Sequence, residues 1–329
     1  MTSWLVSAQR SFATNDMTTQ PITPPRLAPG DTVALISPAS PPRNRRLLLL
    51  GRKRLEQLGL SVVPGKHVLS EYGYLAGSDR DRLRDLEAAF RDPRVKAIFC
   101  ARGGYGVSRL LAGFDPALAT RHPKALIGFS DITVLHLAMQ KAGVVSFWGP
   151  MPCTGLGWTP FSVRSLERTL MSGSPVGRVP FSSRRRSRTL RPGIAQGPLT
   201  GGTLSLVAAS LGTSYEVDTR GRIVFFEDVD EEPYRVDRLL AQLIAAGKLA
   251  DAAGVALGIF TGTKVRNSPG RLSLTMQEVF ADHLLPLKIP ILANLAVGHV
   301  PDQVTLPYGI EARLDAAART LEVLEPGVA

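Results

Sequence analysis

Short apolar runs alternate with helical patterns along the first half of this chain, and few folds accommodate that order. Apolar runs bounded by Gly, Pro or charged residues predict buried strands, and apolar residues spaced three and four apart predict helices. The predicted strands are residues 32–37, 60–63, 95–100 and 125–127, and the predicted helices are residues 43–58, 79–90, 107–111 and 131–141. This alternation implies an α/β fold with a parallel sheet, helices on both faces, and an active site where the strands end.

The second half of the chain is also predicted to be α/β, in a less regular order. The predicted strands are residues 222–226, 255–260, 290–293 and 320–324, and the last of them is predicted to be an edge strand. Three helices are predicted: one that begins at Gly201, one over residues 234–246 and one over residues 272–284. We therefore predict two domains, residues 26–175 and 197–326. The arginine-rich residues 176–196 between them have no apolar period, which predicts a basic linker or surface loop.

The first 25 residues are polar and contain prolines, which predicts a disordered extension (residues 1–25), with Met17 as an alternative start. Their only apolar stretch, residues 4–6, is too short for the core of a signal peptide. No apolar run in the chain approaches the ~20 residues that a membrane-spanning helix needs. The sequence therefore predicts a cytoplasmic protein without membrane insertion.

The formal net charge of +11 raises the question of a nucleic-acid partner. Much of the excess lies in residues 43–54 and 184–191. The first cluster fits the exposed face of a helix whose other face carries four leucines (Leu47, Leu48, Leu50 and Leu55). Because no aromatic residues interleave with the charges, a solvated basic surface is favoured over nucleic-acid binding. Attraction to anionic cell-wall or membrane polymers is left open.

Metal and disulfide chemistry is not predicted. The two cysteines, Cys100 and Cys153, are too few and too far apart in sequence for a disulfide framework or a zinc site, and the five histidines show no metal-binding spacing. We therefore expect no metal ion and no organic cofactor.

Ser130 lies where the predicted strand 125–127 passes into a predicted helix. A serine on such a turn points its hydroxyl out of the sheet, and the backbone N–H of the next residue, Asp131, faces the same spot, as in a nucleophile elbow. The other interpretation is a helix N-cap, because Ser or Asp at a helix start satisfies free N–H groups. The segment by itself favours the cap.

A serine nucleophile needs a base within hydrogen-bond reach and an acid behind that base. Among the histidines only His299 follows a strand on a glycine-flanked loop, where its side chain is free to point into a cleft. His136 lies nearly two turns from Ser130 on the same predicted helix and cannot reach its hydroxyl. Glu227 follows the strand 222–226 directly. A loop histidine bonded to backbone, and a solvated acid, are the alternatives.

The Arg-Gly-Gly-Tyr-Gly segment of residues 102–106 follows the predicted strand 95–100. Its glycines either serve the turn alone, by allowing a positive φ, or let a backbone N–H approach a substrate and donate to an oxyanion. The residues alone leave both interpretations open.

Seven motifs together resemble one known family. They are residues 76–79, 102–106, 128–133, 149–150, 201–206, 227–238 and 298–299, in this order. The chain resembles the LD-carboxypeptidase family over residues 26–326; these serine peptidases include muramoyltetrapeptide carboxypeptidase and the microcin C self-immunity hydrolases. The resemblance implies a flavodoxin-like N-terminal domain, a second α/β domain and a homodimer.

The resemblance also implies the roles of five residues. A Ser-Glu-His triad maps onto Ser130, Glu227 and His299, and an oxyanion hole onto the backbone N–H groups of Gly104 and Asp131. Two positions depart from the family pattern: Trp148 stands where a histidine is frequent, and Thr203 where an asparagine is frequent. Neither is a triad member, so these departures concern pocket shape and substrate preference.

The function implied is a serine carboxypeptidase that releases terminal D-Ala from a muropeptide tetrapeptide during cell-wall recycling. The partner is then a muropeptide or another small peptide. One alternative is a microcin-immunity-like hydrolase of peptidyl or aminoacyl nucleotides. Another is a non-catalytic or nucleic-acid-binding protein on the same scaffold. The retained Ser, Glu and His argue against the non-catalytic form, and the lack of stacking aromatics argues against nucleic-acid binding.

Overall fold

The computed structural model describes residues 20–182, 184, 186–264 and 272–329. Its first sheet has the order β12-β5-β4-β3-β1-β2. The strands are β1 (Thr32–Ile36), β2 (Ser61–Pro64), β3 (Val95–Cys100), β4 (Ala125–Gly128), β5 (Phe147–Trp148) and β12 (Leu306–Pro307). All neighbours pair in parallel except β12, which runs antiparallel to β5. The predicted α/β class with a parallel N-terminal sheet is therefore confirmed.

Helices cover this sheet, and their starts follow from local capping. They are α1 (Arg45–Glu56), α2 (Asp79–Arg91), α3 (Ala117–Arg121), α4 (Thr133–Lys141) and α5 (Pro160–Leu170), with 3-10 turns η1 (Val107–Arg109) and η2 (Ser130–Ile132). The side chains of Asn44, Ser78 and Thr159 cap α1, α2 and α5 by accepting backbone N–H groups. Where a helix was predicted over residues 107–111, the structure has only the 3-10 turn η1. Helix α5 was not predicted.

The second sheet has the order β6-β14-β13-β8-β9-β10-β11-β7. Its strands are β6 (Gly177–Arg178), β7 (Arg188–Arg191), β8 (Ile194–Thr203), β9 (Ile223–Val229), β10 (Gly254–Thr261), β11 (Ile291–Ala293), β13 (Glu311–Asp315) and β14 (Thr320–Val323). The four central strands, β8 to β11, are parallel. The associated helices are α6 (Leu204–Ala209), α7 (Pro233–Ala245), α8 (Met276–Leu284) and the 3-10 turn η3 (Leu285–Leu287).

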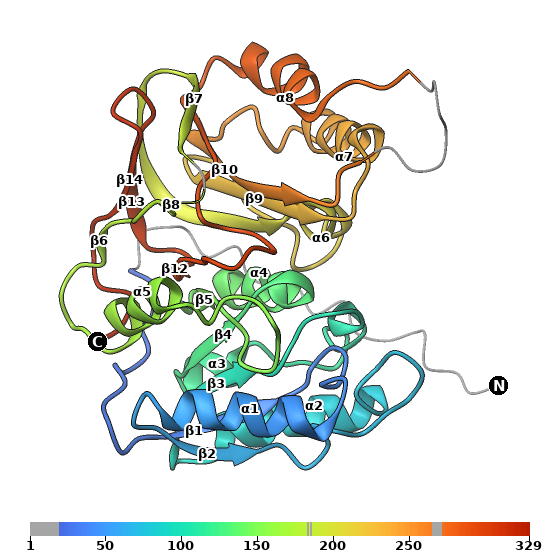
Figure 1. The fold of residues 1–329 in the computed structure, drawn as a ribbon, viewed down its shortest axis with the longest axis vertical. Helices are drawn as coiled ribbons and strands as arrows, with labels where there is room; N and C mark the ends of the chain where they lie inside the picture. Colours follow the sequence, from blue (N-terminus) through green and yellow to red (C-terminus); the bar gives the residue numbers. More distant parts are fainter. Residues whose placement is uncertain (1–19, 183, 185, 265–271) are drawn as a thin grey trace.

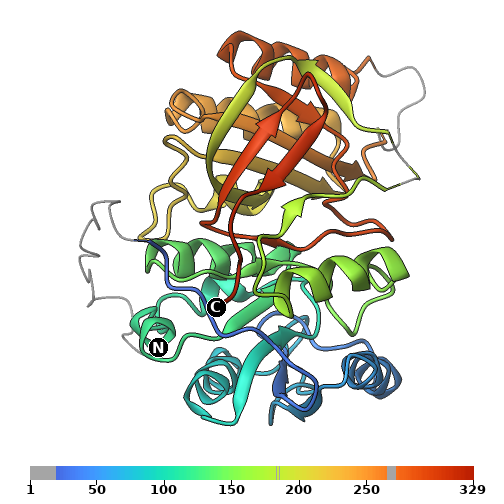
Figure 2. The ribbon, with the colours of Figure 1, turned by 90° about the vertical axis from the view of Figure 1, so that its left-hand side faces the viewer.

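The two halves of the chain are interlocked. The first sheet lies below the second in Figure 1, and α4 lies between them. Strand β12, from the second half of the chain, completes the edge of the first sheet beside β5. The C-terminal residue also contacts the first half of the chain, because Arg26 N donates to the Ala329 carbonyl at 2.9 Å. In Figure 2 the C-terminus lies beside the first sheet, in the lower half of the picture. The carboxyl ends of β4 and β9 thereby come to the same interface.

Three predictions about individual segments were wrong. Residues 176–196, predicted to be a linker or surface loop, contain β6, β7 and the first residues of β8, because these segments pair with strands from distant parts of the chain. Strand β14, predicted to be an edge strand, has partners on both sides. In α1 the buried residues are Gly51 and Leu55, whereas Leu50 is exposed.

Most of the predicted disordered extension, residues 1–19, lies outside the described residues. Its last residues are ordered by backbone pairing: Ile22 N donates to the Gly143 carbonyl at 2.7 Å, and Ala329 N donates to the Pro24 carbonyl at 2.9 Å. In the part of the chain that the structure covers, no helix has the length and apolar character needed to cross a bilayer.

Candidate active site

Ser130 occupies a strained turn directly after β4. Its φ is +62°, a left-handed conformation that costs a residue with a Cβ about 1–2 kcal/mol. Such strain persists where the surrounding packing imposes it, and it clusters at functional sites. The helix-cap interpretation is wrong, because Phe129 and Ile132 occupy the cap positions of η2 and α4, and neither helix has a side-chain cap. Ser130 is partly exposed.

His299 and Glu227 form a buried acid–imidazole pair. The Nδ1 atom of His299 lies 2.9 Å from Oε2 of Glu227, whose side chain is fully buried, and the imidazole is 16% exposed. Since a carboxylate accepts, Nδ1–H donates and Nε2 of the neutral ring keeps its lone pair. Burial opposes protonation, but the hydrogen bond and charge of Glu227, with the charges of Asp228 and Asp230, outweigh it and raise the pKa of His299.

Glu227 lies inside a strand rather than just after one. Strand β9 continues to Val229, so the prediction that the strand ends at residue 226 was too short. The second oxygen of the Glu227 carboxylate, Oε1, accepts a hydrogen bond from Thr203 Oγ1 at 2.6 Å. With His299 on one oxygen and Thr203 on the other, the buried carboxylate has a partner on each side. This satisfies the requirement that a buried charge be hydrogen-bonded.

The imidazole of His299 lies against the Ser130 turn. Its ring packs edge-on against Phe129, the residue before the serine, with ring centroids 4.9 Å apart. The backbone N–H of Thr203 donates to Thr133 Oγ1 at 3.2 Å and ties the end of β8 to the start of α4. Among the described residues no hydrogen bond joins Ser130 to His299. Bonds of this kind are commonly long without substrate and shorten in its complex.

The glycine loop after β3 packs directly on Ser130. A Cβ at Gly103 would lie 2.8 Å from Ser130 Cβ and 3.4 Å from the Asp131 nitrogen, and a Cβ at Gly104, where φ is +121°, would lie 2.2 Å from Ser40 Oγ. Both positions therefore require glycine for close approach, and Gly104 requires it for its backbone conformation as well. Gly104 is exposed. The loop and the Ser130 turn thus bring the backbone of Gly104 and Asp131 to the same edge of the sheet.

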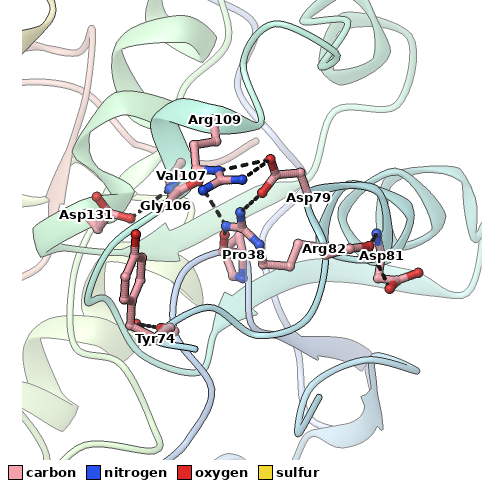
Figure 3. A network of polar contacts seen from close by, with 11 residues as sticks. Pro38, Tyr74, Asp79, Asp81, Arg82, Gly106, Val107, Arg109 and Asp131 are labelled. Carbon is pink, nitrogen blue, oxygen red and sulfur yellow. Dashed lines mark hydrogen bonds and ion pairs between the residues drawn. The ribbon is translucent and has the colours of Figure 1, made fainter. Parts of the chain in front are cut away.

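A buried polar network holds this loop in place (Figure 3). Asp131 Oδ2 accepts the backbone N–H of Val107 at 2.9 Å. Burial raises the pKa of Asp131 to about 6, against the effects of that N–H and of the charge of Arg82. Arg82, fully buried, donates to the Gly106 carbonyl at 2.9 Å and pairs with Asp79. The side chains of Arg82 and Asp131 therefore bind the carbonyl and the N–H of a single peptide group, the one between Gly106 and Val107.

Sequence reasoning missed Arg82 and the side-chain roles of Thr203 and Asp131; Thr203 was connected only with pocket shape and substrate preference. A signal existed for Arg82, because it shares a face of α2 with Leu86 and Phe90, four residues apart in each step, and both are buried. Trp148, singled out as a departure from the family pattern, does not line the site. Its ring is fully buried and packs on Phe129 with centroids 5.2 Å apart.

His136 and His283 each have other partners. His136 is fully buried: Nε2 lies 2.9 Å from the Gly128 carbonyl, and Nδ1 lies 2.9 Å from Ser146 Oγ. Burial lowers the pKa of His136 to about 4, so it is a neutral core residue. His283 pairs with Asp237. Over the described ranges, no three His, Cys, Asp or Glu side chains are grouped in a way that could hold a metal ion.

Comparison with known proteins decides the family. Residues 33–149 match the LD-carboxypeptidase N-terminal domain, and residues 196–314 match the LD-carboxypeptidase C-terminal domain. The chain belongs to the LD-carboxypeptidase family. A probable murein peptide carboxypeptidase of Bacillus subtilis is 41% identical over 313 residues, which are 93% of this chain and 95% of that protein.

Two solved structures have the same fold as this chain. The muramoyltetrapeptide carboxypeptidase from Oxalobacter formigenes superposes with a TM-score of 0.75 at 30% identity, covering 89% of this chain and 97% of the other. An MccF-like protein from Bacillus anthracis superposes with a TM-score of 0.82 at 26% identity, covering 92% and 99%.

Proposed function

We propose that this LD-carboxypeptidase releases the terminal D-Ala of a muropeptide tetrapeptide during cell-wall recycling. The similarity to the probable murein peptide carboxypeptidase of Bacillus subtilis and to the muramoyltetrapeptide carboxypeptidase from Oxalobacter formigenes supports this substrate class. The working form that we propose is a cytoplasmic homodimer, as the family resemblance implies; light scattering on the purified protein measures that state.

One observation carries the catalytic assignment. The buried Glu227–His299 pair, joined at 2.9 Å, lies against the strained turn that presents Ser130. In this proposal Ser130 is the nucleophile, His299 the general base and Glu227 the acid that orients the imidazole. Thr203 is a positioning residue that acts through Glu227.

The proposed reaction is an acyl transfer in two halves. Ser130 Oγ attacks the carbonyl carbon before the terminal residue while His299 Nε2 takes the hydroxyl proton. The tetrahedral oxyanion accepts the N–H groups of Gly104 and Asp131. His299 then gives the proton to the leaving amine, the C–N bond breaks, and free D-Ala departs. Water, deprotonated by His299, attacks the acyl-serine ester and regenerates Ser130.

A peptide panel tests this function. Purified protein is offered a tetrapeptide ending in D-Ala, its all-L isomer, the pentapeptide and an aminoacyl-nucleotide analogue, with products read by mass spectrometry. We expect D-Ala from the tetrapeptide and little turnover of the others, because a site built for one stereochemistry leaves donors unpaired with the other. Cleavage of the nucleotide analogue without D-Ala release would instead support the microcin-immunity-like alternative, for which the MccF-like fold leaves room.

The pH dependence of kcat/KM is predicted to report His299. A general base acts only when neutral, so activity falls as pH drops through the His299 pKa. Since Glu227 raises that pKa, the acid limb in the wild type is expected above the ordinary value of ~6.5. Glu227→Gln removes the negative charge that raises the His299 pKa, whereas the burial that lowers this pKa remains. The acid limb of kcat/KM is therefore expected to move to lower pH in this variant. Identical acid limbs in the two proteins would contradict the assignment.

Thr203→Val is predicted to lower kcat by about 10- to 100-fold. The change removes the hydroxyl that donates to Glu227 Oε1, and a hydrogen bond to a charged group contributes about 1.5–3 kcal/mol. Thr203→Ser, which keeps the hydroxyl, is the control and should stay within a few-fold of the parent. If kcat fell as far in Thr203→Ser as in Thr203→Val, or did not fall in Thr203→Val, the Thr203 hydroxyl would not position Glu227.

A further inference from the structure

Two arginines near the glycine loop, Arg102 and Arg43, form no ion pair with any acidic side chain that the structure describes. Arg102 directly precedes Gly103, and consecutive Cα atoms are 3.80 Å apart. A Cβ at Gly103 would be 3.0 Å from Ser130 Oγ, so Arg102 extends from backbone next to the proposed nucleophile. Its Nη1 donates to the Pro41 carbonyl at 3.4 Å, which places the guanidinium over the loop that follows β1. That loop continues into Arg43.

The charges around this pair are unbalanced. Arg102 is only partly exposed, and burial together with the charge of Arg43 lowers its pKa. Within the described part of the chain, neither guanidinium has a carboxylate within the 4.0 Å of an ion pair. The first turn of the adjacent α1 holds no acidic residue either. An arginine presents five N–H donors, and the long bond to Pro41 uses only one of them.

A carboxypeptidase substrate supplies the missing anion at this place. Its scissile carbonyl must lie against Ser130, and its C-terminal carboxylate follows one residue beyond. Arginine suits a carboxylate because its planar donors bind both oxygens at once. We propose that Arg102, assisted by Arg43, binds the C-terminal carboxylate of the substrate and so restricts the enzyme to the last peptide bond. This inference rests on the proposed function and names the residues that make it a carboxypeptidase rather than an endopeptidase.

The test compares a tetrapeptide with a free C-terminal carboxylate and the same peptide with a C-terminal amide. For the wild type we expect kcat/KM to be about 10- to 100-fold higher on the acid, the range of a charged hydrogen-bond contribution. Arg102→Gln should lose that preference: its kcat/KM falls on the acid and stays within a few-fold of the wild type on the amide. Arg102→Lys should recover part of it, since the charge remains and the paired donors do not. Arg43→Gln should reduce the preference less.

Arg45→Gln is the matched control, because Arg45 is an exposed arginine of the same basic cluster and the change removes the same charge. It should keep the wild-type preference; an equal loss there would show a diffuse basic field instead of a site. Equal losses for Arg102→Gln on acid and amide, with an unchanged circular dichroism spectrum, would overturn the proposal.

A binding readout separates this inference from the proposed function. Calorimetry of the acid and amide peptides on Ser130→Ala reports carboxylate recognition without turnover. If the wild type releases no D-Ala, the proposed function is wrong. If Ser130→Ala also binds the acid and the amide peptide with equal affinity, the proposed arginine site is wrong as well. If D-Ala is released and Arg102→Gln in the Ser130→Ala background still prefers the acid by the wild-type factor, only the arginine site is overturned. The exposed Arg43 supplies a second variant should Arg102→Gln fail to fold.

Discussion

Ser130→Ala is expected to lower kcat by about 10⁶-fold, as the loss of the nucleophile does in another serine protease. The reason is chemical, because alanine lacks the hydroxyl that Ser130 presents at the start of η2, where its φ is +62°. The measurement is steady-state release of D-Ala from the tetrapeptide. Alanine retains the Cβ and the left-handed strain, so the melting temperature should stay near that of the parent.

Two further variants separate chemistry from folding at this turn. Ser130→Gly should also be inactive, but it should melt at or above the parent temperature, because glycine adopts the φ of +62° without steric cost. Ser108→Ala, which removes a hydroxyl from a partly exposed position nearby, should remain active. If Ser130→Ala kept more than about a tenth of the activity, Ser130 would not be the nucleophile.

His299→Ala and Glu227→Ala are expected to be damaging to different degrees. Loss of the base removes proton transfer, whereas loss of the orienting acid leaves an imidazole that still samples the required tautomer. In another serine protease the base costs ~2 × 10⁶ in kcat and the acid ~3 × 10⁴. We expect the same order here, measured as kcat on the tetrapeptide. Glu227→Gln is the cleaner partner variant, because it keeps the volume of a fully buried side chain.

His283→Ala is the control for this pair. His283 is also a partly buried histidine that bonds a carboxylate, that of Asp237, and it should tolerate replacement without loss of activity. His136 is unsuitable as a control, because its ring is buried between Gly128 and Ser146 and its removal would disturb β4 itself. Equal activity of His283→Ala and His299→Ala would mean that His299 is not the base.

Much of the first sheet follows from local patterns. The predicted strand 95–100 has the bounds of β3, and strands 32–37 and 125–127 each differ from the structure by one residue at the end. Apart from Thr32 in β1 and the exposed Lys96 in β3, the positions of these strands are buried and apolar or glycine, so the run itself marks the strand. Among the strands that were missed, β6, β7 and β12 have no such run. They form because a partner strand offers unpaired backbone groups, which no local pattern records.

The residues of the candidate site also divide into those that local patterns predicted and those that they did not. The turn after β4, the glycine loop, and the histidine and acid beside later strands were all candidates from sequence, because strand ends, glycines and isolated polar residues are local features. The roles of Thr203 and Arg82 were not, since each depends on a contact with a distant segment: Thr203 with Glu227, and Arg82 with Gly106. The local sequence around a threonine in a strand does not show whether its hydroxyl donates to water or to a buried carboxylate.

The sequence by itself determined the fold class and the order of the chemical groups along the chain. Periodicity and turn residues act over a few positions, and they suffice to set which segments are strands and where each polar side chain leaves the sheet. Only the tertiary structure decided that His299 bonds Glu227, 72 residues away in sequence, and that the His299 ring packs on Phe129 in the Ser130 turn. That meeting depends on how two sheets pack and on the return of β12 to the first sheet, because contacts across such separations form only when the whole chain has folded.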